Sequence, residues 1–223
     1  MKKLLLSVLT LTLLLSCSLL AKDATPKEKY KVEIITEQSN KKGMFGNTVY
    51  IKVRDFLLLI IESAAANKLA GEVQNYVNAY GLNKEKIALK FNGKLKVSLL
   101  EDFSPQKYQY NKFENVSVNY TLRQKAYTYL LSVDKDEVCL LYPNTTATNS
   151  LLSQGAYALG GYAFNAKGIV QLHLVSSLNV IDFSKFDPKG IYRCTTRGKG
   201  IQKVANIKNH HTNDVLRQDI FVK

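Results

Sequence analysis

The chain has 223 residues, a formal net charge of +13 and no tryptophan. A chain of this length can bury one good hydrophobic core or two small ones. It shows neither a basic helix nor an aromatic stacking motif, so nucleic acid is excluded as the expected partner. The basicity is mostly lysine and has two interpretations: compositional drift in a Lys- and Asn-rich chain, or contact with an anionic polymer through a basic surface.

The first residues, MKKLLLSVLTLTLLLSCSLLAKD, have the pattern of an export signal. Two lysines precede an apolar run from Leu4 to Leu15. Such a run is of signal-peptide length and too short to span a bilayer comfortably. We therefore expect residues 1–16 to be removed, and they take no part in the fold.

The cleavage site has two interpretations. The segment Leu14–Cys17 resembles the lipobox of bacterial lipoproteins, which predicts a lipidated Cys17 as the mature N-terminus. Several acyl chains on one cysteine anchor a protein stably, whereas a single chain does not. Ser18 follows the cysteine where an inner-membrane signal has aspartate, and this resemblance to enteric sorting favours an outer membrane lipoprotein. The alternative is ordinary cleavage near Ser18 or Ala21, which would leave a soluble periplasmic protein.

Residues 22–29, KDATPKEK, are polar and contain a proline, and residues 17–29 are therefore the expected lipidated tether that lifts the domain off the membrane. The alternating segment Tyr30–Glu37 predicts a strand, and the two glycines of SNKKGMFGN predict a loop after it.

Residues 48–80 predict a long helix. Apolar residues recur close to a period of 3.6, most clearly from Asp55 onward, and Gly81 stands where a helix C-terminus belongs. The β-branched residues of 48–53 could instead form a short strand first. The six consecutive apolar residues Phe56–Ile61 indicate burial on most sides, so we expect a core helix; an interface helix is the alternative.

Asn92-Gly93 predicts a tight hairpin turn between strands at Lys86–Phe91 and Lys94–Leu100, because both residues tolerate the positive φ that the turn needs. The flanking strands, Tyr30–Glu37 and Ile87–Leu100, are the expected cover for the long helix. The sequence therefore predicts a small N-terminal α+β unit over residues 30–108. Ser104–Lys107, a proline among polar residues, is the expected joint.

Four further segments have strand patterns: residues 115–122, 126–133, 137–142 and 168–177. The second and third would pair around the charged turn Asp134–Asp136. Pro143 would stop the third, because proline lacks an amide hydrogen and forces its neighbour into extended geometry. A last hairpin is expected around Asn165–Gly168. Short strands at this spacing predict a mainly antiparallel β-sandwich over residues 112–205, and thus an α+β fold, with residues 206–223 as a C-terminal tail that adds a strand or packs back.

The stretch YTYLLSVDKDEVCLLYPN and the later strand KGIVQLHLVSS resemble the bacterial domain of unknown function 4384. The resemblance covers roughly residues 112–200 and is carried by Leu141, Tyr142, Pro143 and Asn144 at the strand end. It implies an envelope or signalling accessory module and brings no established catalytic residue. We expect Pro143 and Asn144 to serve architecture, with the Asn144 side chain capping the turn.

Cys139 and Cys194 remain once Cys17 is lipidated. In an oxidising compartment an even pair can form a disulfide bond. The favoured interpretation is nevertheless two separately buried small hydrophobic residues.

Motifs for catalysis, metals and cofactors are weak. His173 lies within a strand and is expected at a surface or hydrogen-bonded position. His210-His211 lack a third ligand nearby, and the acids of the 134–137 turn lack the spacing of a Ca²⁺ loop. No GxSxG motif occurs, and Leu159-Gly160-Gly161 lacks the lysine of a phosphate-binding loop. We expect no cofactor and no metal.

Two functional hypotheses follow. The favoured one is a non-enzymatic envelope lipoprotein that is held at the membrane by its lipid anchor and docks onto an envelope protein assembly. The alternative is a periplasmic hydrolase of envelope polymers with an unrecognised site. A concave pocket with converging histidines or acids of perturbed pKa would favour the hydrolase.

Overall fold

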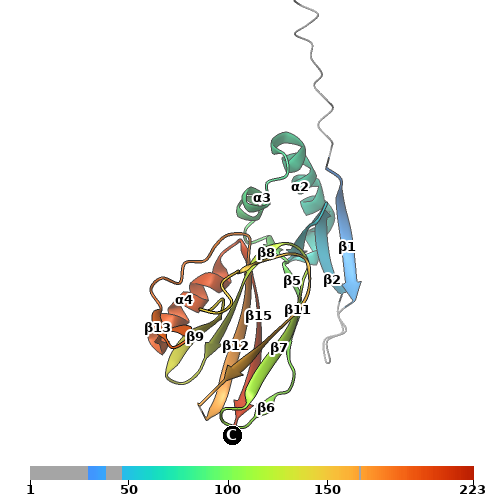
Figure 1. Cartoon of the computed structure of the whole chain (residues 1–223). Coiled ribbons are helices and arrows are strands. Elements are labelled where there is room, and N and C mark those ends of the chain that lie inside the picture. Colours follow the sequence, from blue (N-terminus) through green and yellow to red (C-terminus); the bar gives the residue numbers. More distant parts are fainter. Residues whose placement is uncertain (1–29, 39–46, 166) are drawn as a thin grey trace, which may run out of the picture.

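The computed structural model describes residues 30–38, 47–165 and 167–223. It is a β-rich α+β protein in which a small sheet with two helices stands above a larger, sandwich-like pair of sheets (Figure 1). The predicted signal at 1–16, Cys17, the tether at 17–29 and most of the loop after the first strand lie outside the described residues. Within the described residues, no helix is long and apolar enough to cross a membrane.

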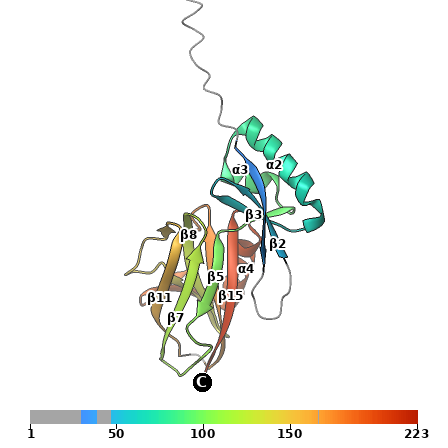
Figure 2. The same cartoon turned by 90° about the vertical axis from the view of Figure 1, so that its right-hand side faces the viewer.

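The upper unit is a four-stranded antiparallel sheet in the order β1-β2-β3-β4, with α2 and α3 packed on one side (Figure 2). Its elements are β1 (Val32–Gln38), β2 (Asn47–Val53), β3 (Phe56–Ile60), the short 3-10 turn η1 (Ser63–Ala65), α2 (Ala66–Tyr80), α3 (Lys84–Lys90) and β4 (Leu95–Val97). Ile51 and Leu58 from the sheet and Val73 from α2 are fully buried together in its core.

The first half of the predicted long helix is wrong. The helix begins only at Ala66, while residues 47–60 form a hairpin whose turn holds Arg54 at φ 57°. The β-branched alternative was therefore correct for β2. The apolar run could not distinguish a helix from a strand. Because four of the five residues of β3 are buried, the run shows neither the alternation of a strand nor the stripe of a helix. The C-terminal stop at Gly81 is confirmed.

The hairpin expected around Asn92-Gly93 is also wrong. Residues 84–90 form α3, and the Asn83 side chain accepts a hydrogen bond from the Lys86 amide at its N-terminus (3.0 Å). Gly93 does adopt a positive φ of 84°, but it joins a helix to β4. The turn signal was sound and the element before it was misassigned, since a seven-residue helix offers too few turns to show its period.

The lower part consists of two sheets that enclose one core. The larger has the order β13-β14-β9-β8-β12-β15-β6, with β10 also paired to β8, and the smaller has the order β11-β7-β5. The bounds are β5 (Leu100–Pro105), β6 (Gln109–Tyr110), β7 (Asn115–Leu122), β8 (Ala126–Val133), β9 (Glu137–Tyr142), β10 (Leu151–Leu152), β11 (Gly155–Ala163), β12 (Gly168–Ser177), β13 (Asp187–Lys189), β14 (Tyr192–Thr196), α4 (Arg197–Asn209) and β15 (Asn213–Val222).

Side-chain alternation places the core between the two sheets. Val118 and Tyr120 of β7 and Leu172 and Leu174 of β12 are buried there. The opposite face of the larger sheet is covered by α4, whose Val204 and Ile207 pack with residues of β8 and β9. The four strands predicted for this part are confirmed at their expected bounds as β7, β8, β9 and β12.

The hairpin expected around Asn165–Gly168 is wrong, because β11 and β12 belong to different sheets; Ala166 itself lies outside the described residues. The expectation that the C-terminal residues 206–223 add a strand is confirmed, since they end α4 and supply β15, which pairs along its whole length with β12. Sequence patterns within a segment cannot show which distant strand it will meet.

The expected joint also lies elsewhere. Ser104 and Pro105 belong to β5, which pairs with β7 in the smaller sheet, so the chain passes from one core to the other just before Leu100. Whether the two units fold independently stays a prediction.

Candidate functional site

The Leu141–Asn144 segment shapes a loop, as expected. Strand β9 ends at Tyr142, and the bond from Tyr142 to Pro143 is cis. The Asn144 side chain donates to the Leu141 carbonyl (3.1 Å) and accepts from the amides of Thr146 (2.9 Å) and Ala147 (2.8 Å). These bonds hold the following turn closed, so the local role predicted for Asn144 is confirmed.

Cys139 and Cys194 form a disulfide bond, which corrects the favoured expectation of two separate thiols. The two cysteines lie directly opposite each other on β9 and β14. This pairing depends on a register between strands 55 residues apart, which neither cysteine's neighbourhood reveals. Glu137 lies close to both sulfur atoms, but bonded sulfurs have no thiolate to offer a metal ion.

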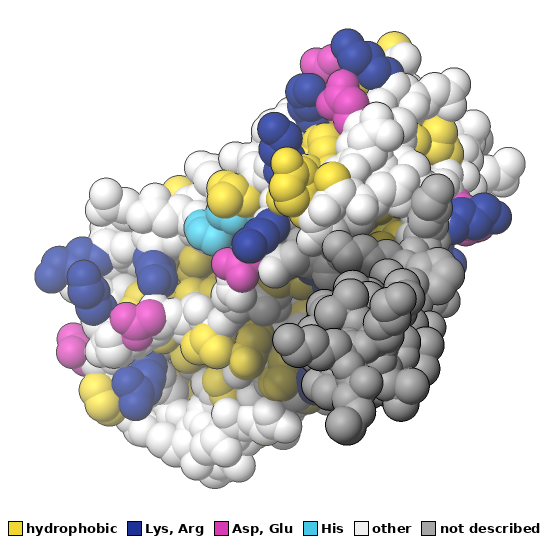
Figure 3. Space-filling view, turned by 90° about the horizontal axis from the view of Figure 1, so that it is seen from above, with side chains coloured by type: hydrophobic (Ala, Val, Ile, Leu, Met, Phe, Trp, Pro, Cys, Tyr) yellow, Lys and Arg dark blue, Asp and Glu magenta, His cyan; other side chains and the backbone are white. Residues whose placement is uncertain are grey.

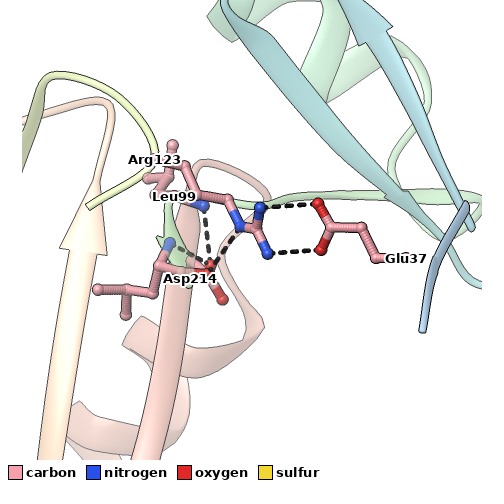
Figure 4. A network of polar contacts seen from close by, with 5 residues as sticks. Glu37, Leu99, Arg123 and Asp214 are labelled. Atoms are coloured by element: carbon pink, nitrogen blue, oxygen red, sulfur yellow. Dashed lines mark hydrogen bonds and ion pairs between the residues drawn. The ribbon is translucent and has the colours of Figure 1, made fainter. Parts of the chain in front are cut away.

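A polar network joins the two units (Figure 4). The Arg123 guanidinium, at the end of β7, donates two hydrogen bonds to the Glu37 carboxylate of β1 (3.0 and 2.8 Å). The Asp214 carboxylate accepts from the amides of Leu99 and Leu100 (2.8 and 2.9 Å), at the point where the chain leaves the upper unit. Burial raises the pKa of Asp214, while these amide donors act in the opposite direction.

The histidines do not converge on one site. His173 is buried on the α4 side of the larger sheet, where neither ring nitrogen has a hydrogen-bond partner. The expectation of a surface or hydrogen-bonded position is therefore wrong. Burial, and then the charge of Arg217, lower the pKa of His173 to about 4. His210 and His211 stack on each other with ring centroids 4.4 Å apart, and His210 bonds to Thr212.

Several clefts open at the surface of the described residues. One of about 470 Å³ lies at the upper end of the sandwich, between the Pro143 loop and residues 180–184. Figure 3 views the molecule from above and shows hydrophobic side chains gathered in a hollow that charged side chains border. A second cleft, of about 750 Å³, has the disulfide and the Glu137–Lys189 ion pair in its wall. A third, of about 790 Å³, lies beside α4. His210 lines a smaller pocket, and His173 lines none of these openings.

The edge strand β11 is the most distinctive surface of the sandwich. It pairs with β7 on one side only and stands at the outer edge of the three-stranded sheet (Figure 2). Although 22% of the chain is charged, neither the nine residues of β11 nor the eight of β7 include a charged side chain. Tyr157 and Leu159 point toward the core, while Ala156 and Ala158 are exposed.

Exposed strand edges expose unpaired backbone donors and acceptors, and proteins normally protect them with charges, proline or bulges. The edge strand β13 carries such protection, since its sequence Asp187-Pro188-Lys189 contains two charged residues and a proline. In β11 a bulge at Gly160-Gly161 interrupts the pairing, and a Cβ atom on Gly160 would come within 2.5 Å of Ser117. The five residues of 155–159 have no such protection within the described structure.

Comparison with known proteins gives no relative. No family model, no curated protein and no solved structure matches the chain. The resemblance to the domain of unknown function 4384 thus stays a prediction.

The sequence patterns did not indicate the open edge, because the only strand expected near β11 was the unbounded first strand of a hairpin with residues 168–177, whereas β11 pairs with β7. Its signal was present as alternating exposed and core-facing residues in GAYALGGYA. The glycines, which favour turns, concealed it.

Proposed function

We propose that this protein is a lipid-anchored, non-enzymatic accessory protein of the bacterial envelope, which docks onto an envelope protein assembly through the open edge of β11. Cys17, in the sequence Leu-Leu-Ser-Cys, carries the lipid and holds the protein at the outer membrane. The upper unit acts as a stem between the tether and the sandwich. The resemblance to an accessory-module family, which brings no catalytic residue, supports the same assignment.

The observation that carries the proposal is the uncharged, unprotected edge at residues 155–159. An extended segment of a partner can add to such an edge as a further strand, with main-chain hydrogen bonds supplying affinity. The small side chains of Ala156 and Ala158 leave the partner room to approach closely. Because β7 beside it is also uncharged, the partner segment needs no charge to match and is expected to be apolar or neutral.

Site-specific photo-crosslinking in intact envelopes tests the docking. A photoreactive phenylalanine replaces Ala158 on β11 in one variant and Ala79 on α2 in the control variant, since both residues are exposed. We expect a discrete protein adduct from position 158 and none of that mass from position 79. Ala156→Lys, added to the first variant, should abolish the adduct, because a charge on the edge opposes strand addition.

Two results would contradict the proposal. One is the same adducts from both positions, which would indicate collision rather than docking. The other is an adduct at position 158 that persists unchanged with Ala156→Lys while the variant remains folded by circular dichroism. In that case the edge would not be the contact.

The anchor is tested separately. Labelled palmitate should enter the wild-type protein and not Cys17→Ala. Equal labelling of the two proteins, or none in either, would refute lipidation at Cys17 without touching the docking proposal.

A further inference from the structure

The cleft beside α4, called the α4 cleft below, is a concave polar site that the docking proposal does not use. It lies between α4 and residues 182–187, has a volume of about 790 Å³ and is lined on the helix side by Lys199, Gln202, Lys203 and Asn206. These residues have the spacing i, i+3, i+4 and i+7, so one face of the helix directs two amines and two amides into the cleft. Lys185 faces them from the opposite wall.

The cations of the α4 cleft are available for a ligand. Helix α4 has the sequence RGKGIQKVANIKN, which contains four cations and no acid. Among the described residues, Lys185, Lys199 and Lys203 make no ion pair within 4.0 Å, although other lysines of the chain do. The Lys203 amine lies 5.6 Å from the centroid of the Phe183 ring. Amines that have no ion-pair partner within 4.0 Å gain Coulomb energy when an anion enters beside them.

The cleft also contains groups that suit hydroxyls. Asp182 and Asp187 line it together with Thr195. The Asp182 carboxylate accepts from the Ser184 amide (2.8 Å). Hydrogen bonds from the backbone and the side chain of Ser184, and then the charges of Lys203 and Lys185, lower the pKa of Asp182. Amide, hydroxyl and carboxylate side chains beside amines can hydrogen-bond sugar hydroxyls, while two carboxylates would repel a densely charged ligand such as polyphosphate.

We propose that the α4 cleft binds a linear anionic glycan, in which carboxylate or phosphate groups are spaced along a hydroxyl-rich chain. The lysines pair with the anionic groups, and Gln202 and Asn206 bond the hydroxyls between them. The concave shape fits a polymer segment and not the plane of a bilayer. Without the two lysines of the predicted signal, the net charge of +13 falls to 13 − 2 = +11, which still raises the encounter rate with such a polymer. The site is separate from β11, so it can tie the anchored protein to an envelope polymer while the edge holds a protein.

The test measures binding of a fluorescently labelled hexamer of mannuronic acid to the full-length protein in detergent, by polarisation. The neutral hexamer of maltose and vesicles containing phosphatidylglycerol serve as alternative ligands. The test variant is Lys199→Gln with Lys203→Gln. The control variant is Lys90→Gln with Lys125→Gln, which removes the same charge from two exposed lysines elsewhere.

We expect the test variant to bind the uronate hexamer at least about tenfold more weakly, as the loss of one charge-assisted hydrogen bond implies. The control variant should change binding less than about twofold, because distant exposed charges are screened. Asn206→Leu, which alters no charge, should also weaken binding severalfold. Equal loss in both double variants would overturn the proposal in favour of diffuse attraction. Binding to vesicles alone, or no hexamer binding by the wild type, would overturn it as well.

Discussion

Two glycines in α4 make a matched pair for testing how closely this helix packs on the larger sheet. A Cβ atom added at Gly200 would lie 2.4 Å from Cβ and Cγ2 of Val138 on β9. A Cβ atom at Gly198, two residues earlier in α4, would meet no heavy atom within 4 Å. Replacing either glycine by alanine gains a similar helix propensity. A difference in stability between the two variants therefore reports the difference in packing.

Helix propensity and overpacking change the free energy of unfolding in opposite directions. Alanine in place of glycine stabilises a helix by about 0.5–1 kcal/mol. At Gly200 the added methyl group lies more than an ångström inside the usual carbon contact distance of about 3.5–4.0 Å, and overpacking of this kind costs about 1–3 kcal/mol. We expect Gly200→Ala to destabilise by about 1–2 kcal/mol and Gly198→Ala to stabilise by about 0.5 kcal/mol, given the same propensity.

Urea unfolding followed by circular dichroism measures the difference. The midpoints should move in opposite directions at unchanged slope, because the slope reports the surface exposed on unfolding. Adding Val138→Ala to Gly200→Ala should recover part of the loss, since it removes Cγ2, one of the two contacted atoms of Val138, while Cβ remains. If both glycine variants are stabilised equally, α4 does not press on β9 as described, and the walls of the α4 cleft are not fixed by that contact.

Three further predictions concern single contacts. Asn144→Ala should lower the free energy of unfolding by about 1 kcal/mol, as the loss of a cap does, without changing photo-crosslinking from β11; loss of the adduct at unchanged stability would place Asn144 in a functional site. The folded-state pKa of His173 is about 4, below its usual value, so the free energy of unfolding should be highest above pH ~6.5 and should decrease as the pH falls toward 4. His173→Phe should flatten this part of the pH profile. An NMR titration midpoint of His173 near the usual value would refute its burial. A double-mutant cycle with Arg123→Met and Glu37→Gln should give a coupling of about 0.5–1 kcal/mol that shrinks in high salt, whereas no coupling would mean that the pair does not join the two units.

The strands of the sandwich could be predicted where one face of a segment is buried and the other is not, or where turn residues bound a buried run, as the 134–136 turn and Pro143 do for β8 and β9. Residues 115–122 alternate strictly, and their bounds agree with β7. The segment Phe56–Ile60 is buried on both faces, so its pattern contains no period to detect. Strand β11 alternates small with large residues instead of polar with apolar ones, and a hydropathy pattern does not register that difference.

The partners of a residue across the fold could not be predicted in the same way. The disulfide requires the register of β14 on β9, and the open edge requires that β11 pair with β7 rather than with β12. The α4 cleft requires that residues 182–187 lie over the helix. Each of these depends on contacts between distant segments, and single-sequence patterns carry information chiefly about near neighbours along the chain.

The position of β15 makes the folding of the sandwich depend on contacts between segments far apart in the sequence. Ten residues of β15 fill the place beside β12, and Asp214 reaches across 115 residues to hold the Leu99 amide. Closing so large a loop is slow in comparison with forming local hairpins. A chain that lacks β15 therefore lacks both the strand that pairs with β12 and the carboxylate that holds the segment between the two units. For the same reason, a fusion at the C-terminus has to leave Val222 free to pair with Tyr110.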